Sequence, residues 1–203
     1  AGTYTASVSF SGKSKVTVDL VVNRGWARVL VLCPKSVVPV WPMEFAKHGA
    51  RPVGVLALDE GSVAARADRV GQFLDLQRAR QEPAVVVANY DAVWRAPMDR
   101  VVLGAGWDAV ICDESHRIKA PGGKAALFCS RLGDRVPHRV ALTGTSLPHS
   151  PLDAYAQYRF LDKGIFGTSF IAFRARYAVM GGFNNKQVLA YQNQEDFHAR
   201  FYS

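Results

Sequence analysis

The sequence predicts an α/β fold in which helices cover both faces of a doubly wound parallel sheet, giving three layers, with a helical appendage at the C-terminal end. Short runs rich in β-branched residues alternate with longer segments of helical period. Most of these runs are apolar almost throughout, which is typical of strands covered on both faces. Four of them end in polar residues, which predicts one ligand-binding edge.

The composition fits one soluble domain of 203 residues, because 49% hydrophobic residues can fill a core of that size. The formal net charge of +8, from 25 Lys and Arg against 17 acidic residues, favours an anionic partner, although many small domains are basic without a functional reason. Cys33, Cys112 and Cys129 lack metal-ligand spacing and are expected to be reduced core thiols. No stretch has the roughly 18 unbroken apolar residues of a membrane helix, and the start lacks a secretion signal. We therefore expect an intracellular protein without membrane contact.

The predicted elements follow in order along the chain. Gly12, Lys13 and Ser14 lead into a first helix that ends near Arg24 and Gly25. The predicted strands cover residues 28–33, 52–59, 83–90, 107–114 and 138–145. Between the second and third of them, residues 61–81 predict an amphipathic crossover helix with arginines on its polar face. Its apolar face is formed by Val63, Ala67, Val70 and Leu74.

The pattern changes past residue 162. The sequence there predicts an aromatic, arginine-rich helix, a glycine turn at Gly181 and Gly182, one short strand and a terminal helix. We therefore divide the chain into a sheet-bearing part, residues 1–163, and a helical appendage, residues 164–203, packed on the same lobe.

The polar strand endings "PKS", "NYD", "DESH" and "TGTS" follow four of the predicted strands. Because carboxyl ends of parallel strands meet at one edge, these residues are expected to lie together where open sheets bind ligands.

Gly12, Lys13 and Ser14 lead into the first helix, as in a phosphate-binding loop, where backbone amides surround the phosphates, lysine reaches the terminal ones and the hydroxyl binds magnesium. The tripeptide alone has a high false-positive rate. Ser7 and Phe10 occupy positions where such loops have glycine. The alternative that this loop no longer binds nucleotide therefore stays open.

Asp113 and Glu114 end a buried apolar strand, which is the Walker B arrangement. A carboxylate at such a strand tip can hold magnesium, and its neighbour can orient and deprotonate a water that attacks the γ-phosphate. The alternative is a solvated loop, which the upstream phosphate-loop tripeptide disfavours.

These segments carry a family resemblance. "VICDESHRIKAPGGK" closely resembles motif II of superfamily-two helicases, in the version of the Swi/Snf-type ATP-dependent DNA translocases. "VALTGTSLPHSPLDAYAQYRFLD" resembles their motif III, "RVLVLCPKSVVPVWPMEFAKH" their motif Ia and "VVVANYDAVWR" the next conserved segment. The resemblance covers residues 12 to 200 and implies the N-terminal RecA-like P-loop lobe of a two-lobe motor, from a bacterium or phage.

The resemblance implies roles for individual residues. Lys13 and Ser14 would hold phosphate and Mg²⁺, Asp113 would bind Mg²⁺, and Glu114 would activate water. His116 would couple the nucleotide site to motif III, although it could also be an ordinary loop histidine. In motif III, Thr143 and Thr145 would hydrogen-bond the acidic cluster.

The resemblance also implies contacts with the nucleic-acid backbone. Lys35 and Ser36 match the segment that contacts DNA, although Lys35 could also be a solvated cation. Further candidates for the same role are Asn89, Tyr90, Arg117 and Lys119.

The expected function is that of a first motor lobe, which binds Mg-ATP and duplex DNA and depends on a second lobe that this chain lacks. The isolated chain is expected to hydrolyse ATP poorly, in the cytoplasm of a bacterial or phage-infected cell, or in the nucleus of a eukaryote. Two alternatives stay open. One is an RNA or DNA unwinding helicase of the same superfamily, and the other is a non-catalytic nucleic-acid-binding module with a degenerate phosphate loop.

Overall fold

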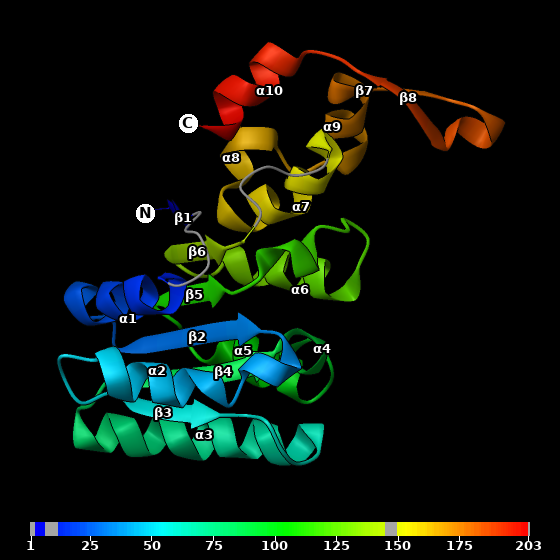
Figure 1. Ribbon diagram of the computed structural model, residues 1–203. Coiled ribbons are helices and arrows are strands. Elements are labelled where there is room, and N and C mark those ends of the chain that lie inside the picture. Colours follow the sequence, from blue (N-terminus) through cyan, green and yellow to red (C-terminus); the bar gives the residue numbers. More distant parts are fainter. Residues whose placement is uncertain (1–2, 7–11, 145–149, 203) are drawn as a thin grey trace.

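The computed structural model describes residues 3–6, 12–144 and 150–202, and its central feature is a parallel sheet (Figure 1). Six strands lie in the order β1-β6-β5-β2-β4-β3, and each neighbouring pair is parallel. The predicted doubly wound α/β class is confirmed, and β1 is a strand that the sequence did not predict. The strands are β1 (Thr3–Ala6), β2 (Arg28–Cys33), β3 (Gly54–Ala57), β4 (Ala84–Asn89), β5 (Ala109–Cys112) and β6 (His138–Leu142).

Helices cover both faces of the sheet. Successive side chains of each strand point to opposite sides, so both faces carry apolar side chains that the helices bury. In β2, Val29 and Val31 pack in one core cluster, and Leu30 and Leu32 pack in the other. The first cluster is closed by α1 (Lys13–Arg24) and α2 (Val40–His48). The second is closed by α3 (Val63–Arg80), α4 (Tyr90–Val93), α5 (Met98–Gly104), α6 (Lys124–Gly133) and α7 (Pro151–Leu161).

The predicted helices form where their patterns place them. The first helix ends before Gly25, whose φ of 65° is the left-handed conformation that glycine adopts without strain. In α3, Ala67 and Val70 are buried and Val63 and Leu74 are half-buried, so the predicted apolar face is the one that packs. The five strands predicted from the sequence also form.

The appendage shares its core with the sheet-bearing part. Phe173, Tyr177 and Phe197 belong to the same buried cluster as the residues of α6 and α7, and Phe166 stacks on Phe197 with ring centroids 5.3 Å apart. The division at residue 163 remains a prediction. The elements of the appendage are α8 (Lys163–Phe166), α9 (Phe170–Tyr177), β7 (Ala178–Gly181), β8 (Gln187–Tyr191) and α10 (Gln194–Phe201).

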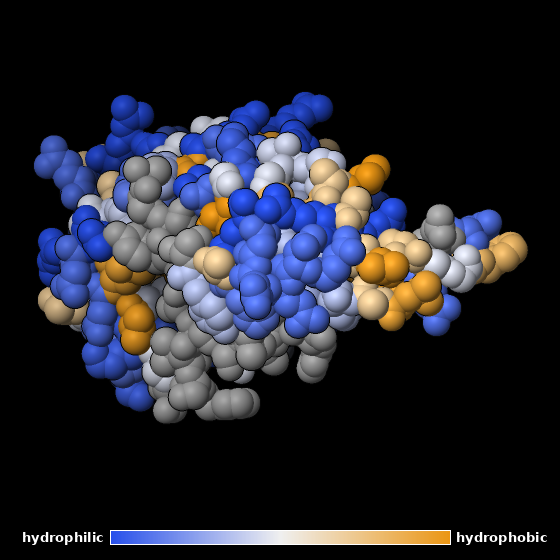
Figure 2. Space-filling model, turned by 90° about the horizontal axis from the view of Figure 1, so that it is seen from above, coloured by the Kyte–Doolittle hydropathy of each residue, from blue (hydrophilic) through white to orange (hydrophobic). Residues whose placement is uncertain are grey.

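The prediction of a single strand in the appendage was wrong. The strands β7 and β8 pair as an antiparallel hairpin, and Gly182, with φ of 70°, lies between them. The strand β7 was not predicted because it follows α9 directly, without a turn residue between the helix and the strand. The hairpin projects from the body in Figures 1 and 2, and Val179, Phe183 and Leu189 are exposed on it. Within the described residues, no helix is both long and apolar enough to span a lipid bilayer.

Candidate functional site

The start of α1 carries the three residues of the predicted phosphate loop. Gly12 directly precedes the helix, and its carbonyl accepts the Val16 N–H at 2.9 Å. Lys13 and Ser14 are the first two helical residues. Since no described side chain caps this helix, the amides of its first turn are available to an anion. Ser7 and Phe10 lie outside the described residues.

An ion pair joins the phosphate-loop lysine to the acidic strand ending. Lys13 Nζ lies 3.0 Å from Glu114 Oε1, although the two residues are 101 positions apart in the chain. The lysine side chain is only 14% exposed. On the other carboxylate oxygen, His116 Nδ1 lies 3.3 Å from Glu114 Oε2. Three of the predicted site residues therefore meet at one carboxylate.

Asp113 is a buried carboxyl group beside this pair. It is 8% exposed, and its Oδ1 accepts the Glu114 N–H at 2.9 Å. Burial, followed by the charge of Glu114, raises the pKa of Asp113, whereas Lys13 opposes the rise. The described surroundings of Asp113 therefore disfavour its ionised form, and a cation at this carboxylate would favour it.

The oxygen donors near this edge suit a hard divalent cation. Asp113 offers a carboxylate and Ser14 a hydroxyl, which are ligand types that Mg²⁺ prefers. Among residues 3–6, 12–144 and 150–202, no group of three or more His, Cys, Asp or Glu could hold a metal ion. An ion held here would therefore draw most of its remaining ligands from water and from a phosphate-bearing ligand, as Mg²⁺ commonly does.

The loop that follows β5 is held in an unusual conformation. Glu114 has φ of 50° and ψ of 53°, a left-handed conformation that costs a residue with a side chain on the order of 1–3 kcal/mol. Tyr90 Oη donates to the Asp113 carbonyl at 2.8 Å, and Ser115 Oγ donates to Gln157 Oε1 at 2.7 Å. These two hydrogen bonds hold the loop from α4 and α7. Gln157 was not predicted as a site residue, because nothing in the local sequence marks a glutamine on a distant helix.

The end of β6 flanks the lysine. A β-carbon added at Gly144 would lie 3.6 Å from Lys13 Nζ, so the backbone after β6 borders the ammonium group. Thr143, the preceding residue, is half-buried. Thr145 lies outside the described residues, and the coupling of His116 to this segment remains a prediction.

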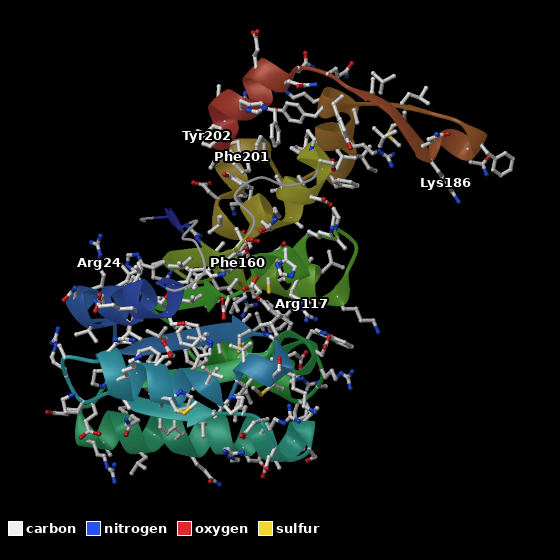
Figure 3. The ribbon with its side chains drawn as sticks, viewed as in Figure 1. Arg24, Arg117, Phe160, Lys186, Phe201 and Tyr202 are labelled. Carbon is white, nitrogen blue, oxygen red and sulfur yellow. The ribbon has the colours of Figure 1, made fainter. Side chains whose placement is uncertain are left out.

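Cations line the carboxyl edge of the sheet. Lys35 and Ser36 are exposed in a short 3₁₀ helix (Lys35–Val37) that follows β2. Arg117 and Lys119 are exposed after β5, and Lys119 Nζ lies 3.6 Å from Asp153 Oδ2. Figure 3 shows Arg117 on the side toward which the arrow of β2 points.

Two residues predicted to contact nucleic acid have buried side chains. Asn89 is 7% exposed, and its Oδ1 accepts the Ala92 N–H at 2.9 Å, which caps α4. Tyr90 is 5% exposed, with its hydroxyl bonded to the Asp113 carbonyl. Both side chains make hydrogen bonds inside the protein, and their contact with a nucleic-acid backbone remains a prediction.

Three residues that the sequence analysis missed extend the cationic edge. The Trp94 ring has Lys124 Nζ 4.7 Å from its centroid and the Arg95 guanidinium carbon 5.0 Å from it. Arg95 follows α4 and Lys124 begins α6, so both lie beyond carboxyl ends of strands that flank β2. The spacing of 30 positions between Trp94 and Lys124 gave no local signal.

A protein-family model matches most of this chain. The family model described as "SNF2-related domain" matches residues 9–195. "DNA repair and recombination protein RAD54-like" of Danio rerio is 27% identical over 143 residues, which are 70% of this chain and 19% of that protein. "DNA excision repair protein ERCC-6" of Mus musculus is 27% identical over 165 residues, which are 79% of this chain and 10% of that protein. The chain thus spans less than a fifth of the length of these relatives.

Solved structures share the fold. The "Sulfolobus solfataricus SWI2/SNF2 ATPase core in complex with dsDNA" matches with a TM-score of 0.66 and 23% identity, covering 87% of this chain and 34% of that one. The "Pyrococcus furiosus Hef helicase domain" matches with a TM-score of 0.58 and 15% identity, covering 78% of this chain and 33% of that one.

Proposed function

Because the chain belongs to the SNF2-related domain family, as its sequence resemblance predicts, we propose that it is the first motor lobe of an ATP-dependent translocase on double-stranded DNA. The observation that carries the proposal is the ion pair between Lys13 and Glu114 beside the buried Asp113. Residues from two distant segments converge there on one edge of a parallel sheet, where such folds bind ligands.

The nucleotide phosphates would bind at the start of α1. The free amides of the first turn and the positive end of the helix dipole attract an anion there, and Lys13 adds a full charge. On binding, the lysine exchanges Glu114 for a phosphate oxygen. Asp113 and Ser14 would hold Mg²⁺, which neutralises charge on the β- and γ-phosphates when it is bound.

Once Lys13 turns to the phosphates, the Glu114 carboxylate is free to accept a proton from an attacking water. His116, which contacts the other oxygen of the same carboxylate, keeps Glu114 oriented. This exchange of partners assigns a role to both members of the Lys13–Glu114 ion pair.

The isolated chain is expected to turn over slowly. In comparable phosphoryl-transfer proteins, an arginine from a second domain stabilises the transferred group and contributes roughly 10³ to 10⁵ in rate. We propose that a second lobe supplies this group and that closure of the two lobes drives movement along DNA.

The cationic edge would contact the DNA backbone. Lys35, Arg117 and Lys119 follow adjacent strands, and exposed cations of this kind bind phosphates without reading sequence. The solved Sulfolobus structure with a similar fold, which is in complex with dsDNA, supports duplex as the partner.

The nucleotide proposal is tested by replacing Lys13 with alanine. Mg-ATP should raise the melting temperature of the unmodified chain, because a ligand at a hundred times its Kd stabilises the folded state by about 2.7 kcal/mol. Lys13→Ala should remove most of this shift. Lys15→Ala is the matched control, since Lys15 is exposed on the same helix and forms an ion pair with Asp19. No shift for the unmodified chain at millimolar Mg-ATP would refute the proposal and favour the non-catalytic binding module.

A further inference from the structure

A hydrogen bond from the buried Ser115 attaches the loop that carries Glu114 to α7. Ser115, the residue after Glu114, is fully buried, and its hydroxyl donates to Gln157 Oε1 at 2.7 Å. From this contact we infer that Gln157 is a positioning residue, which acts through Ser115 to keep the Glu114 carboxylate directed at Lys13. The inference rests on the role proposed above for Glu114.

Gln157 lies half-buried on α7. The buried side chains of this helix are alanine, leucine and aromatic residues, and Gln157 is not one of them. Both ends of its amide are nevertheless hydrogen-bonded within the protein, to Ser115 and to the Asp153 carbonyl.

The orientation of the amide is determined by its second contact. Gln157 Nε2 donates to the Asp153 carbonyl at 3.2 Å, one turn earlier in the helix. Because a carbonyl oxygen can only accept, the nitrogen must face Asp153, and Oε1 is left to face Ser115. The acceptor for Ser115 is thus fixed in place before any ligand binds.

The hydrogen bond acts where the backbone is strained. Glu114 is in the left-handed region, and an unrestrained glutamate would return to a negative φ. Such a change would rotate its side chain away from Lys13 and His116. Ser115 and Gln157 restrain the residue that immediately follows the strained one, so they oppose this return.

A second contact ties the far end of the loop to the same helix. Lys119 Nζ lies 3.6 Å from Asp153 Oδ2, and Lys119 directly follows the short helix Ser115–Ile118. This pair is partly exposed and contributes little by itself. Of the two contacts with α7, the hydrogen bond of the buried Ser115 is therefore the one that we assign to the positioning of Glu114.

The backbone of Glu114 gives a direct readout in the 203-residue chain. Gln157→Leu keeps the approximate size of the side chain and removes the acceptor. The HN–Hα coupling and the Cα chemical shift of Glu114 report φ, and in this variant both should move toward the values of a negative φ. Ser115→Ala should give the same change, and the double variant should add nothing further, because both substitutions remove one hydrogen bond.

Arg159→Ala is the matched control on α7. Arg159 forms a two-point ion pair with Asp134 at the other side of the helix, with distances of 2.7 Å and 3.1 Å. Its loss should lower the melting temperature and leave the Glu114 signals unchanged. An equal displacement of Glu114 in Arg159→Ala, or none in Gln157→Leu, would overturn the inference.

Single-turnover cleavage of ATP separates positioning from binding. Gln157→Leu should slow cleavage by on the order of 10- to 100-fold, as small displacements of a catalytic group do, while the Kd for Mg-ATP stays within about twofold. A displaced Glu114 with an unchanged cleavage rate would also overturn the inference. Failure of the unmodified chain to bind Mg-ATP would instead refute the proposed function, and the Glu114 signals would still decide whether Gln157 holds the loop.

Discussion

At the scale of single residues, the site combines charge with burial. Asp113 has a raised pKa because it is buried and next to Glu114. Suppose that the pKa of a carboxyl group is higher in the folded chain than in the unfolded chain. The free energy of unfolding then falls as the pH rises from the unfolded-state pKa to the folded-state pKa, and it stays lower at higher pH. The protein therefore carries an electrostatic cost at neutral pH that a bound cation would relieve.

Asp113→Asn should accordingly stabilise the ligand-free chain at pH 7. The amide keeps an oxygen for the Glu114 N–H and removes the buried charge. Each kcal/mol of relief raises the melting temperature by about 2–4 °C for a chain of this size, and the gain should vanish below the ordinary aspartate pKa of 3.8. The exposed Asp68→Asn serves as control, with an expected change within about 0.5 kcal/mol. A lower melting temperature for Asp113→Asn at pH 7 would show that its charge is already compensated.

The sequence motifs predicted which residues meet at the site, whereas contacts between residues far apart in the chain could not be predicted from the sequence. Lys13, Asp113 and Glu114 were predicted because phosphate and magnesium chemistry requires those residue types at strand and helix ends. The capping role of Asn89 was not predicted, because a strand end gives no indication of whether a side chain faces solvent or caps the next helix. Gln157 was missed because its partner lies 42 positions away in the chain.

At the scale of elements, the strands that follow apolar β-branched runs were predictable, and those that depend on a partner were not. The four-residue β1 pairs with β6 along its whole length, so its conformation comes from the neighbour rather than from its own composition. The hairpin β7–β8 likewise forms by mutual pairing. In contrast, β4 is buried throughout and consists mainly of valine and alanine, which gave a strong local signal.

The elements after β4 and β5 place cations on one edge, and under the proposed function duplex DNA would bind there. Lys124 begins α6, where a cation opposes the helix dipole, so it does not stabilise that helix. Lys124→Ala should weaken binding to a labelled duplex by roughly fivefold to tenfold at about 0.1 M salt and lower the salt slope by about one. The measurement is fluorescence anisotropy over a range of salt concentrations.

Arg80→Ala provides the matched control for that experiment. Arg80 is exposed at the C-terminal end of α3, a crossover helix that runs back to the opposite edge of the sheet. Its removal lowers the net charge equally and should leave binding unchanged. Equal losses in both variants would mean that overall charge, rather than the carboxyl edge, attracts the duplex.

At the scale of the whole molecule, two segments joined by a parallel sheet form one site. The start of α1 and the end of β5 meet through Lys13 and Glu114, and the backbone after β6 borders the same ammonium group. The appendage packs on α7, and α7 in turn holds the loop that carries Glu114. The helix α7 therefore contacts both the loop that carries Glu114 and the appendage.

The most direct test locates the bound metal-nucleotide in the chain. With Mn²⁺ in place of Mg²⁺, ATP should broaden the amide signals of residues 12–14 and 113–114 and leave those near Gln81, at the opposite edge, sharp. Excess Mg-ATP should reverse the broadening, because both ions would compete for one site. Broadening centred at the opposite edge of the sheet would contradict the account. So would broadening that excess Mg-ATP fails to reverse, or no broadening at all.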